Sequence, residues 1–296
     1  MQTITINGKD LLWLAGLLEG DGCFDQRKVH GESPAPRISI GLIDEDTIKK
    51  VSKIWGSSYY QTPPRKEKEK VIYKSMISGS KALHIMKLLQ PYMGERRSLK
   101  ILGLTQKMDI FLALKHPGPP LTKYKVKITG NYSEEALSNF YLSGLLEAEG
   151  SFLKGPPSSP NDPKISIQMS DKDIINKVAN MWETGYTSWQ RSGITKSGNP
   201  YKKMYCAICR GKKGLEVMRL LHPFLSKRRQ QQIQDVFDSY DDKATKKGHL
   251  KRIKCDRDLA HKLHKDGLSD RAIAKELGVH HSTVQYALGR SRRLHN

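Results

Sequence analysis

The chain has 296 residues, with 51 Lys and Arg against 30 Asp and Glu, so its formal net charge is +21. A charge of this size opposes compaction and favours a polyanionic partner, of which nucleic acid is the most common. No apolar run approaches the roughly 20 residues of a membrane-spanning helix, so we expect no membrane partner. Four scattered cysteines make no disulfide framework and no signal peptide is evident, so an intracellular place is expected, in cytoplasm, nucleoid or organelle matrix.

The first part of the chain predicts the element order α-β-β-α-β-β-α, which is typical of an α+β domain with an antiparallel sheet. The expected elements are a helix over Asp10–Glu19, strands over Gly22–Arg27 and Arg37–Leu42, a helix from near Asp44, a hairpin of Tyr59–Gln61 with Val71–Ile77, and a helix over Ala82–Leu89 with another after Pro91.

The second part repeats the first. PRISIGLIDEDTIKKVSKIWGSSYY at 36–60 matches PKISIQMSDKDIINKVANMWETGYT at 163–187, and GSKALHIMKLLQPYMGERR at 79–97 matches GKKGLEVMRLLHPFLSKRR at 211–229. A repeat this long predicts two similar domains rather than a solenoid. The matching elements are a helix over Asn139–Glu147, strands over Gly150–Lys154 and Lys164–Met169, a helix from near Asp171, and a hairpin of Tyr186–Trp189 with Lys203–Cys209.

Two segments read as linkers. Residues 115–133 are rich in Pro and Gly, and residues 241–255 are charged and poor in apolar side chains. The predicted domains are therefore 1–114 and 134–240, followed by a small domain at 256–296.

The same unusual nonapeptide occurs once in each repeat, as LAGLLEGDG at 14–22 and LSGLLEAEG at 142–150. Gly16 and Gly144 fall inside helices, where Gly costs about 1 kcal/mol relative to Ala. The cost is explained if the two helices pack closely on each other across a pseudo-two-fold axis. Asp21 and Glu149 would then converge, and two facing carboxylates indicate a divalent cation between them.

These nonapeptides resemble the motif of the LAGLIDADG homing endonucleases, in the single-chain form that carries it twice. The resemblance covers about residues 10–240. It implies two pseudo-symmetric domains that form a DNA-binding saddle, with each sheet in the major groove of a double-stranded target. It also implies a monomer that cleaves both strands across the minor groove with Mg²⁺ or Mn²⁺, leaving short 3′ overhangs.

The resemblance also assigns roles near the metal. The last acid of each motif, Asp21 and Glu149, is implied as a metal ligand, and Gly20 and Ala148 are the adjoining metal-site positions. The first copy has Asp where the second has Glu, so the two active sites need not be equivalent. The earlier acids, Glu19 and Glu147, are expected to support the helix ends.

Two further pairs of positions match the family's pattern. Asp44 and Asp171 fall where the family places a polar residue that orders water near the metal, and a helix N-cap is an equally weighted alternative. Arg96 and Arg228 match a basic residue after the proline of the last helix region. The adjacent Arg97, Lys227 and Arg229 compete for that role, and ordinary phosphate contact is the alternative for all of them.

Base recognition is expected from side chains on the DNA-facing side of the sheets, because Arg and Gln pair bidentately with guanine and adenine. For each candidate the alternative is a solvated strand residue. The candidates are Gln26, Lys28, Arg37, Ser39, Gln61, Arg65, Lys74, Gln168, Gln190, Arg191, Lys202 and Lys203.

The tail predicts a small all-α helix-turn-helix domain. A helix over Asp258–Lys265 ends at Gly267, Ser269 caps a second helix, and a third follows from about Ser282. SDRAIAKELGVHHSTVQYAL resembles the resolvase-invertase, or Hin-like, class. The residues expected to face a DNA groove are His281, Ser282, Thr283, Gln285 and Tyr286, with Arg290 on phosphate.

Three functions stay open at this stage. The first is a site-specific double-strand DNA endonuclease. The second is a group I intron maturase on the same scaffold, which would bind intron RNA. The third is a transcription regulator of the WhiA type, in which a degenerate LAGLIDADG fold accompanies a helix-turn-helix. Asp21 and Glu149 argue against the third, because a protein that only binds has no use for facing acids.

Overall fold

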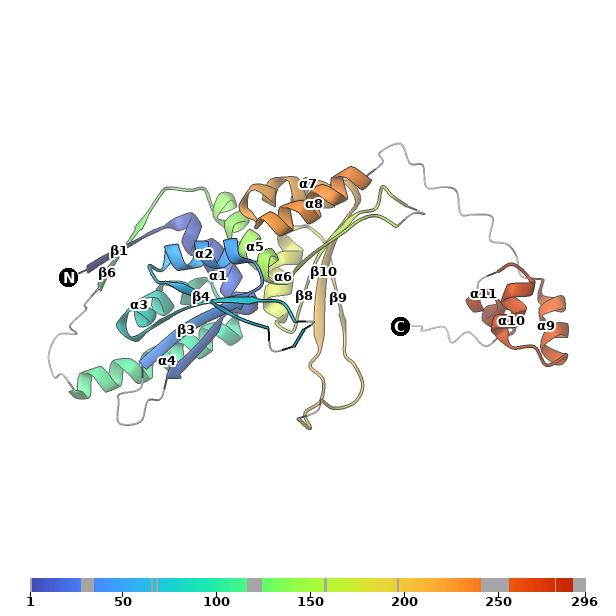
Figure 1. Cartoon of the computed structure of the whole chain (residues 1–296), viewed down its shortest axis with the longest axis horizontal. Coiled ribbons are helices and arrows are strands. Elements are labelled where there is room, and N and C mark those ends of the chain that lie inside the picture. The colour runs from blue at the N-terminus through green and yellow to red at the C-terminus, as the bar shows by residue number, and fades with distance from the viewer. Residues whose placement is uncertain are drawn as a thin grey trace. The chain divides into compact units, whose positions relative to one another are not determined.

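A computed structural model of the chain describes residues 2–27, 35–64, 66–67, 69–115, 124–156, 159–195, 197–240, 256–279 and 281–289. The chain divides into two units, Met1–Asp241 and Asp242–Asn296, each of which is considered by itself (Figure 1). Across the described ranges, no helix has the length and apolar character needed to cross a membrane.

The first unit contains the same series of elements twice. The first repeat consists of β1 (Gln2–Asn7), α1 (Gly8–Asp21), β2 (Cys23–Arg27), β3 (Ala35–Leu42), α2 (Glu45–Ile54), β4 (Tyr59–Thr62), β5 (Ile72–Ser78), α3 (Gly79–Leu89), the short 3₁₀ helix η1 (Gln90–Tyr92) and α4 (Glu95–Lys115). The second consists of β6 (Tyr124–Thr129), α5 (Glu134–Glu149), β7 (Gly150–Leu153), β8 (Lys164–Met169), α6 (Lys172–Met181), β9 (Tyr186–Trp189), β10 (Met204–Arg210), α7 (Gly211–Leu221), η2 (His222–Phe224) and α8 (Lys227–Ser239).

Each repeat builds one four-stranded antiparallel sheet, in the order β2-β3-β5-β4 and β7-β8-β10-β9. Ile38 and Ile40 in β3, and Ile165 and Ile167 in β8, alternate with more exposed residues, as expected for strands with one face in a core. The expected α+β fold class, with two repeated αββαββα domains and a helical tail, is confirmed.

The segment 115–133 differs from the expected linker, because it contains β6. β6 pairs with β1 in parallel, from Gln2 opposite Tyr124 to Asn7 opposite Thr129 (Figure 1). Residues 124–129 read YKVKIT, in which apolar and polar side chains alternate as in a strand. The Pro and Gly residues before them suggested a linker. Each repeat therefore begins with a strand before its first helix.

The second unit is a small bundle of α9 (Arg257–Lys265), α10 (Asp270–Glu276) and α11 (His281–Ala287). Ser269 caps α10 as expected, since its hydroxyl accepts a hydrogen bond from the Ala272 amide at 3.3 Å. Ala260, Ile273 and Val284 are fully buried in its core. The predicted helix-turn-helix arrangement is present within the described residues.

Candidate functional site

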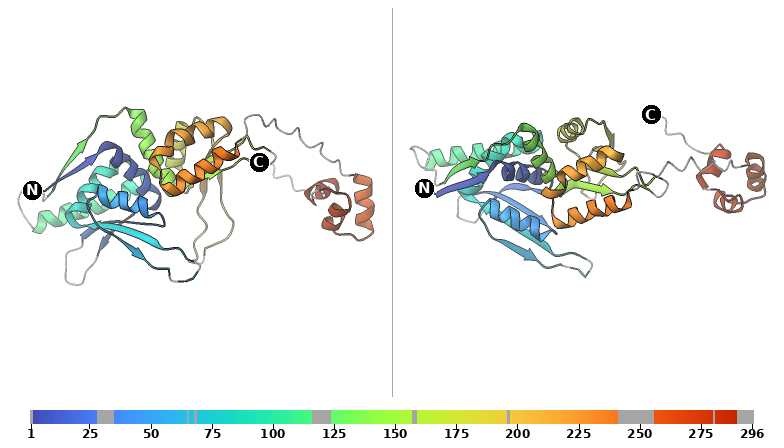
Figure 2. Two further views of the ribbon diagram at one scale, coloured as in Figure 1. Left: turned by 45° about the horizontal axis from the view of Figure 1, so that its top comes forward. Right: turned by 90° about the horizontal axis from the view of Figure 1, so that it is seen from above.

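The helices α1 and α5 pack directly on each other at the centre of the first unit (Figures 1 and 2). A methyl group added to Gly16 would lie 1.9 Å from the backbone oxygen of Tyr141. A methyl group added to Gly144 would lie 1.9 Å from the backbone oxygen of Trp13. These positions are related by the repeat, so the two backbones touch at both glycines, and this close approach explains the glycines inside the helices.

The ends of the two helices stay close together beyond this crossing. A Cβ on Gly20 would lie 2.4 Å from the Ala148 Cβ and 2.9 Å from the Glu149 Cγ. Gly20 therefore leaves the space that the side chains of the second repeat occupy. Asp21 and Glu149 are the last residues of α1 and α5, at the negative ends of both helix dipoles.

Electrostatics at this junction disfavour two bare carboxylates. Burial raises the pKa of Asp21, while Arg97 and Arg229 act in the opposite direction. The pKa of Glu149 is raised by burial first and by the charge of Asp21 second. The two acids therefore lie close enough to repel each other, and a bound cation would relieve this repulsion.

Arg97, in the first turn of α4, holds the end of α1. Its guanidinium donates to the backbone oxygens of Gly22 and of Gly20, the latter at 2.7 Å. It also lies 3.4 Å from the carboxylate of Glu19, which is fully buried. The second oxygen of Glu19 accepts the Gly94 amide at 2.7 Å. Glu19 thus balances the buried arginine and ties α1 to the start of α4.

Arg229, in the first turn of α8, does the same for α5. It donates to the backbone oxygens of Gly150 at 2.7 Å and Glu147 at 3.0 Å. The Glu147 carboxylate lies 4.0 Å from its Nε, and accepts the amide of Ser226 at 2.8 Å and its hydroxyl at 2.6 Å. The expected support of the helix ends by both inner glutamates is what the geometry shows.

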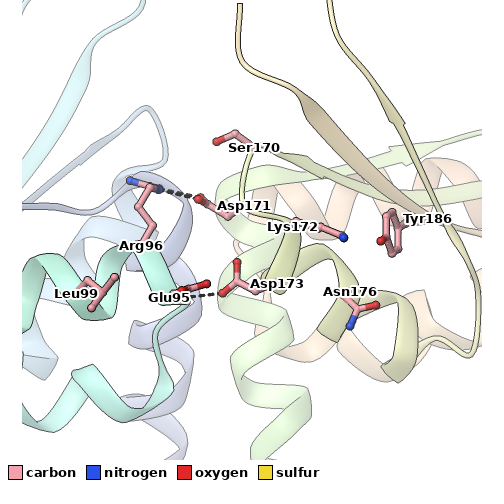
Figure 3. A pocket seen from close by; sticks show the side chains of 9 residues that line it. All are labelled: Glu95, Arg96, Leu99, Ser170, Asp171, Lys172, Asp173, Asn176 and Tyr186. Carbon is pink, nitrogen blue, oxygen red and sulfur yellow. Dashed lines mark hydrogen bonds and ion pairs between the residues drawn. The ribbon is translucent and has the colours of Figure 1, made fainter.

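The outer arginines form ion pairs that cross between the repeats. Arg96 of the first repeat makes two hydrogen bonds to Asp171 of the second, at 2.7 and 2.8 Å (Figure 3). Arg228 of the second repeat makes two to Asp44 of the first, both at 2.6 Å. Both aspartates occupy helix N-cap positions, but neither side chain makes a capping hydrogen bond. Each is instead bound to the opposite repeat.

Two more aspartates reinforce this crossing, and the sequence analysis missed them. Asp173 accepts the backbone amide of Glu95 at 2.7 Å (Figure 3), and Asp46 accepts that of Lys227 at 2.9 Å. Each therefore caps the first turn of α4 or α8 from the other repeat. The sequence could have indicated them, because both aspartates occupy the same position of the repeat.

A pocket of about 670 Å³ adjoins the Arg96–Asp171 pair (Figure 3). It lies at the junction of the repeats, because α4 of the first and α6 of the second both line it. The lining residues are Glu95, Arg96, Leu99, Ser170, Asp171, Lys172, Asp173, Asn176 and Tyr186.

The outer face of each sheet consists of the strand positions that alternate with the buried isoleucines. Arg37, Ser39 and Lys74 lie on this face of the first sheet, because Arg37 and Ser39 alternate with Ile38 and Ile40 and Lys74 pairs with Gly41. Gln168 lies on the corresponding face of the second sheet, as the repeat counterpart of Gly41.

Two predicted readers differ from the expectation. Gln26 pairs with the buried Pro36, and Gln61 pairs with Tyr73, which packs on the core. Both therefore occupy the inner-face register of the first sheet, although Gln26 is only half-buried and Gln61, near the end of β4, is exposed. Residue type alone suggested them, whereas the pairing register decides which side of a strand a residue occupies.

The remaining candidates lie at loops or outside the described ranges. Gln190, Arg191, Lys202 and Lys203 are exposed between β9 and β10, where Gln190 donates to the Tyr201 backbone oxygen at 2.8 Å. Lys28, Arg65 and Arg290 lie outside the described residues.

In the second unit, α11 buries Val284 and Ala287 and turns its other side outward. His281, Ser282 and Tyr286 are exposed, and Thr283 and Gln285 are half-buried. The Arg257 guanidinium lies 5.9 Å from the centre of the Tyr286 ring, which adds a cation to this surface.

The donor set at the helix ends fits a hard cation such as Mg²⁺ or Mn²⁺, which prefers carboxylate and carbonyl oxygens. Asp21 and Glu149 supply the carboxylates. The Gly20 oxygen accepts one hydrogen bond from Arg97, which leaves one of its two lone pairs. Among the described residues, no cluster of three or more His, Cys, Asp or Glu side chains forms an alternative site.

Comparison with known families matches residues 255–291 to a helix-turn-helix domain, which agrees with the fold of the second unit. A comparison with curated protein sequences finds no match. Among solved structures, the chain is similar to the LAGLIDADG meganuclease I-AabMI bound to uncleaved DNA, with 15% identity and a TM-score of 0.49 over 95% of this chain and 99% of that one. It is also similar to the LAGLIDADG homing endonucleases I-GzeII, in complex with its DNA target (12%, 0.48, over 93% and 97%), and I-LtrWI, bound to target DNA (14%, 0.48, over 78% and 91%).

Proposed function

We propose that this chain is a metal-dependent, site-specific DNA endonuclease of the LAGLIDADG type, with a helix-turn-helix that provides a second DNA contact. The observation that carries the proposal is the crossing of α1 and α5 at Gly16 and Gly144. It brings Asp21 and Glu149, the last residues of both helices, together. A binding fold gains nothing from two partly buried acids that repel each other.

Asp21 and Glu149 would hold the metal, and the Gly20 and Ala148 backbone adjoins it. Bound there, Mg²⁺ or Mn²⁺ would activate a water molecule and stabilise the oxygen that departs from a phosphodiester. The acids are ionised when the metal binds, because carboxylate ligands must lose their protons. Their raised pKa values make the metal-free pair unfavourable, which favours a cation at neutral pH.

Arg97 and Arg229 act as positioning residues. Each donates to backbone oxygens on both sides of one acid, Gly20 and Gly22 around Asp21 and Glu147 and Gly150 around Glu149, so each would position that acid. Arg96 and Arg228 are paired with Asp171 and Asp44, so their role is to join the repeats. An ordered water beside these pairs would agree with the family's pattern for both aspartates.

The proposed substrate is double-stranded DNA. A net charge of +21 favours it, and Lys74 on the outer face of the first sheet supplies a cation there. Both motifs occur in one chain, so a monomer suffices to cut both strands. Cleavage across the minor groove with short 3′ overhangs, in an intracellular compartment, completes the proposal.

The decisive experiment incubates a randomised duplex DNA library with Mg²⁺ and either the wild type or the double variant Asp21→Asn with Glu149→Gln. We expect sequenced ends at one long, nearly fixed site, from the wild type alone. Each substitution removes a charge and keeps the shape of the side chain. Cleavage that persists in the double variant would refute the assigned site.

A sequence-specific regulator is a second candidate, and the helix-turn-helix unit at residues 255–291 favours it. The same library separates the two functions. A regulator would enrich one site by binding, without Mg²⁺-dependent cleavage, and the double variant would enrich that site equally well.

A further inference from the structure

Arg37 and Asp25 form an ion pair on the outer face of the first sheet. They are directly opposite in the β2–β3 register. The Arg37 Nε donates to one carboxylate oxygen at 2.7 Å and an Nη donates to the other at 2.6 Å. Both side chains are about one-third exposed, with values of 33% and 32%. The pair is therefore accessible, and its geometry is held by two parallel hydrogen bonds.

This pairing uses only one edge of the guanidinium. Arg has five N–H donors, and the contact with Asp25 occupies one on Nε and one on the Nη beside it. Three donors remain, all on the two terminal nitrogens. Two of these lie side by side at the far end of the fork. That is the arrangement that donates to O6 and N7 of guanine in the major groove.

The partner carboxylate argues against a phosphate contact. Arg37 holds the pKa of Asp25 below its ordinary value, so Asp25 is ionised at neutral pH and the pair has no net charge. A cation that served to neutralise phosphate would lose most of its attraction in this way. The pairing with Asp25 instead fixes the orientation of the Arg37 guanidinium plane before DNA binds.

The second repeat has no counterpart of this pair. The position equivalent to Arg37 is Lys164, and its register partner in β7 is Leu153, not an acid. Lys is a single point charge without a planar fork. The Arg210–Asp162 ion pair lies beside Lys164, but its printed contact is a single one of 3.4 Å. The fork held by two hydrogen bonds therefore occurs at the Arg37 position and not at its counterpart in the second sheet.

We propose that Arg37, oriented by Asp25, recognises a guanine in the half-site that the first repeat binds. This rests on the proposed function, since it names a base that the proposed DNA-binding sheet selects. Arg37 is the specificity-determining residue, and Asp25 is a positioning residue that acts through it.

The test is selection of bound sequences from randomised duplex DNA, with Ca²⁺ in place of Mg²⁺ so that bound DNA can be recovered. The variants are Arg37→Lys, which keeps the charge, and Asp25→Asn, which keeps the shape. Lys87→Ala is the matched control, because Lys87 pairs with Asp109 between helices α3 and α4. Thermal unfolding of each variant checks that the fold is retained.

We expect the wild type to select one G·C pair in one half of its site. Arg37→Lys should reduce that preference about tenfold or more, at that position alone. Asp25→Asn should reduce it less, and Lys87→Ala should leave it unchanged.

Two results would overturn the inference in different ways. If Arg37→Lys selects the same site with the same preferences, Arg37 reads no base, although the proposed function stands. If the wild type enriches no site at all, the proposed function fails and the inference fails with it.

Discussion

The two repeats agree in what joins them and differ in what they present to a ligand. Both use a glycine at the helix crossing, a buried glutamate, a buried arginine and an arginine that pairs with an aspartate of the opposite repeat. Each contact between the repeats has one residue in each copy. A change in one copy must therefore be matched by a change in the other. The pseudo-symmetry is therefore a requirement of packing.

The differences gather at the helix ends and on the sheets. Gly20 and Asp21 face Ala148 and Glu149, so the copy with the smaller neighbour carries the shorter acid. The positions equivalent to Asp25 and Arg37 are Leu153 and Lys164, which form no ion pair. The chain thus keeps a symmetric interface and varies the surfaces that would contact an asymmetric target. The predictions below test this division.

The buried arginines should show the largest effect. Arg97→Met leaves Glu19 with one hydrogen bond, from Gly94, whereas Arg229→Met leaves Glu147 with two, from Ser226. Loss of one partner of a buried pair costs about 3–5 kcal/mol, and we expect Arg97→Met to lie at the upper end. Urea unfolding measures both. Adding Glu19→Gln to Arg97→Met should restore part of the loss, and no recovery would contradict the pairing.

The helix crossing comes next, and here the repeats should behave alike. Gly16→Ala and Gly144→Ala each place a methyl group 1.9 Å from a backbone oxygen, so each should lower the free energy of unfolding by about 3 kcal/mol. Gly103→Ala in α4 is the control, since its added methyl group would meet no atom within 4 Å beyond its chain neighbours and the nearby backbone of its own helix. It should stabilise the helix by about 1 kcal/mol. Similar values for all three variants would rule out the close crossing.

The carboxylates at the helix ends predict a cation-dependent stability. The pKa values of Asp21 and Glu149 lie above the ordinary 3.8 and 4.5. The folded, metal-free protein therefore releases these two protons at a higher pH than the unfolded chain does. Its free energy of unfolding falls as the pH rises from the ordinary pKa values through the raised ones. Asp21→Asn or Glu149→Gln should remove this loss.

Cation binding needs the ionised forms, so Ca²⁺ should raise the Tm at pH 7 more than at pH 5. At a hundredfold excess over Kd the gain is about 2.7 kcal/mol. The double variant should lose the response, and the single variants show which repeat contributes more. An undiminished response in the double variant would place the cation elsewhere.

The crossed ion pairs should show the smallest effect, because the Arg96 and Arg228 side chains are 51% and 37% exposed. Double-mutant cycles of Arg96→Ala with Asp171→Ala, and of Arg228→Ala with Asp44→Ala, should each give a coupling of about 1 kcal/mol. Equal coupling energies would confirm that the two ion pairs contribute symmetrically. Zero coupling in both would show that the pairs add nothing to the joining of the repeats.

Much of this molecule followed from the sequence, because its signals are local or repeated. Alternation in RISIGL and KISIQM predicted strands, the repeat predicted two domains, and Ser269 predicted a helix start. The mid-helix glycines predicted a close crossing of the two helices. The position of Asp21 and Glu149 at the helix ends then predicted that these acids converge. Each inference needed only periodicity, propensity or comparison of the chain with itself.

The tertiary structure alone decided which residues meet. β1 pairs with β6, which lies more than a hundred residues later in the sequence. Asp173 caps a helix of the other repeat. The register placed Gln26 opposite the buried Pro36 and brought Asp25 opposite Arg37. Sequence patterns describe one element at a time. Contacts between elements depend on register and packing, which form only when the whole chain buries its core.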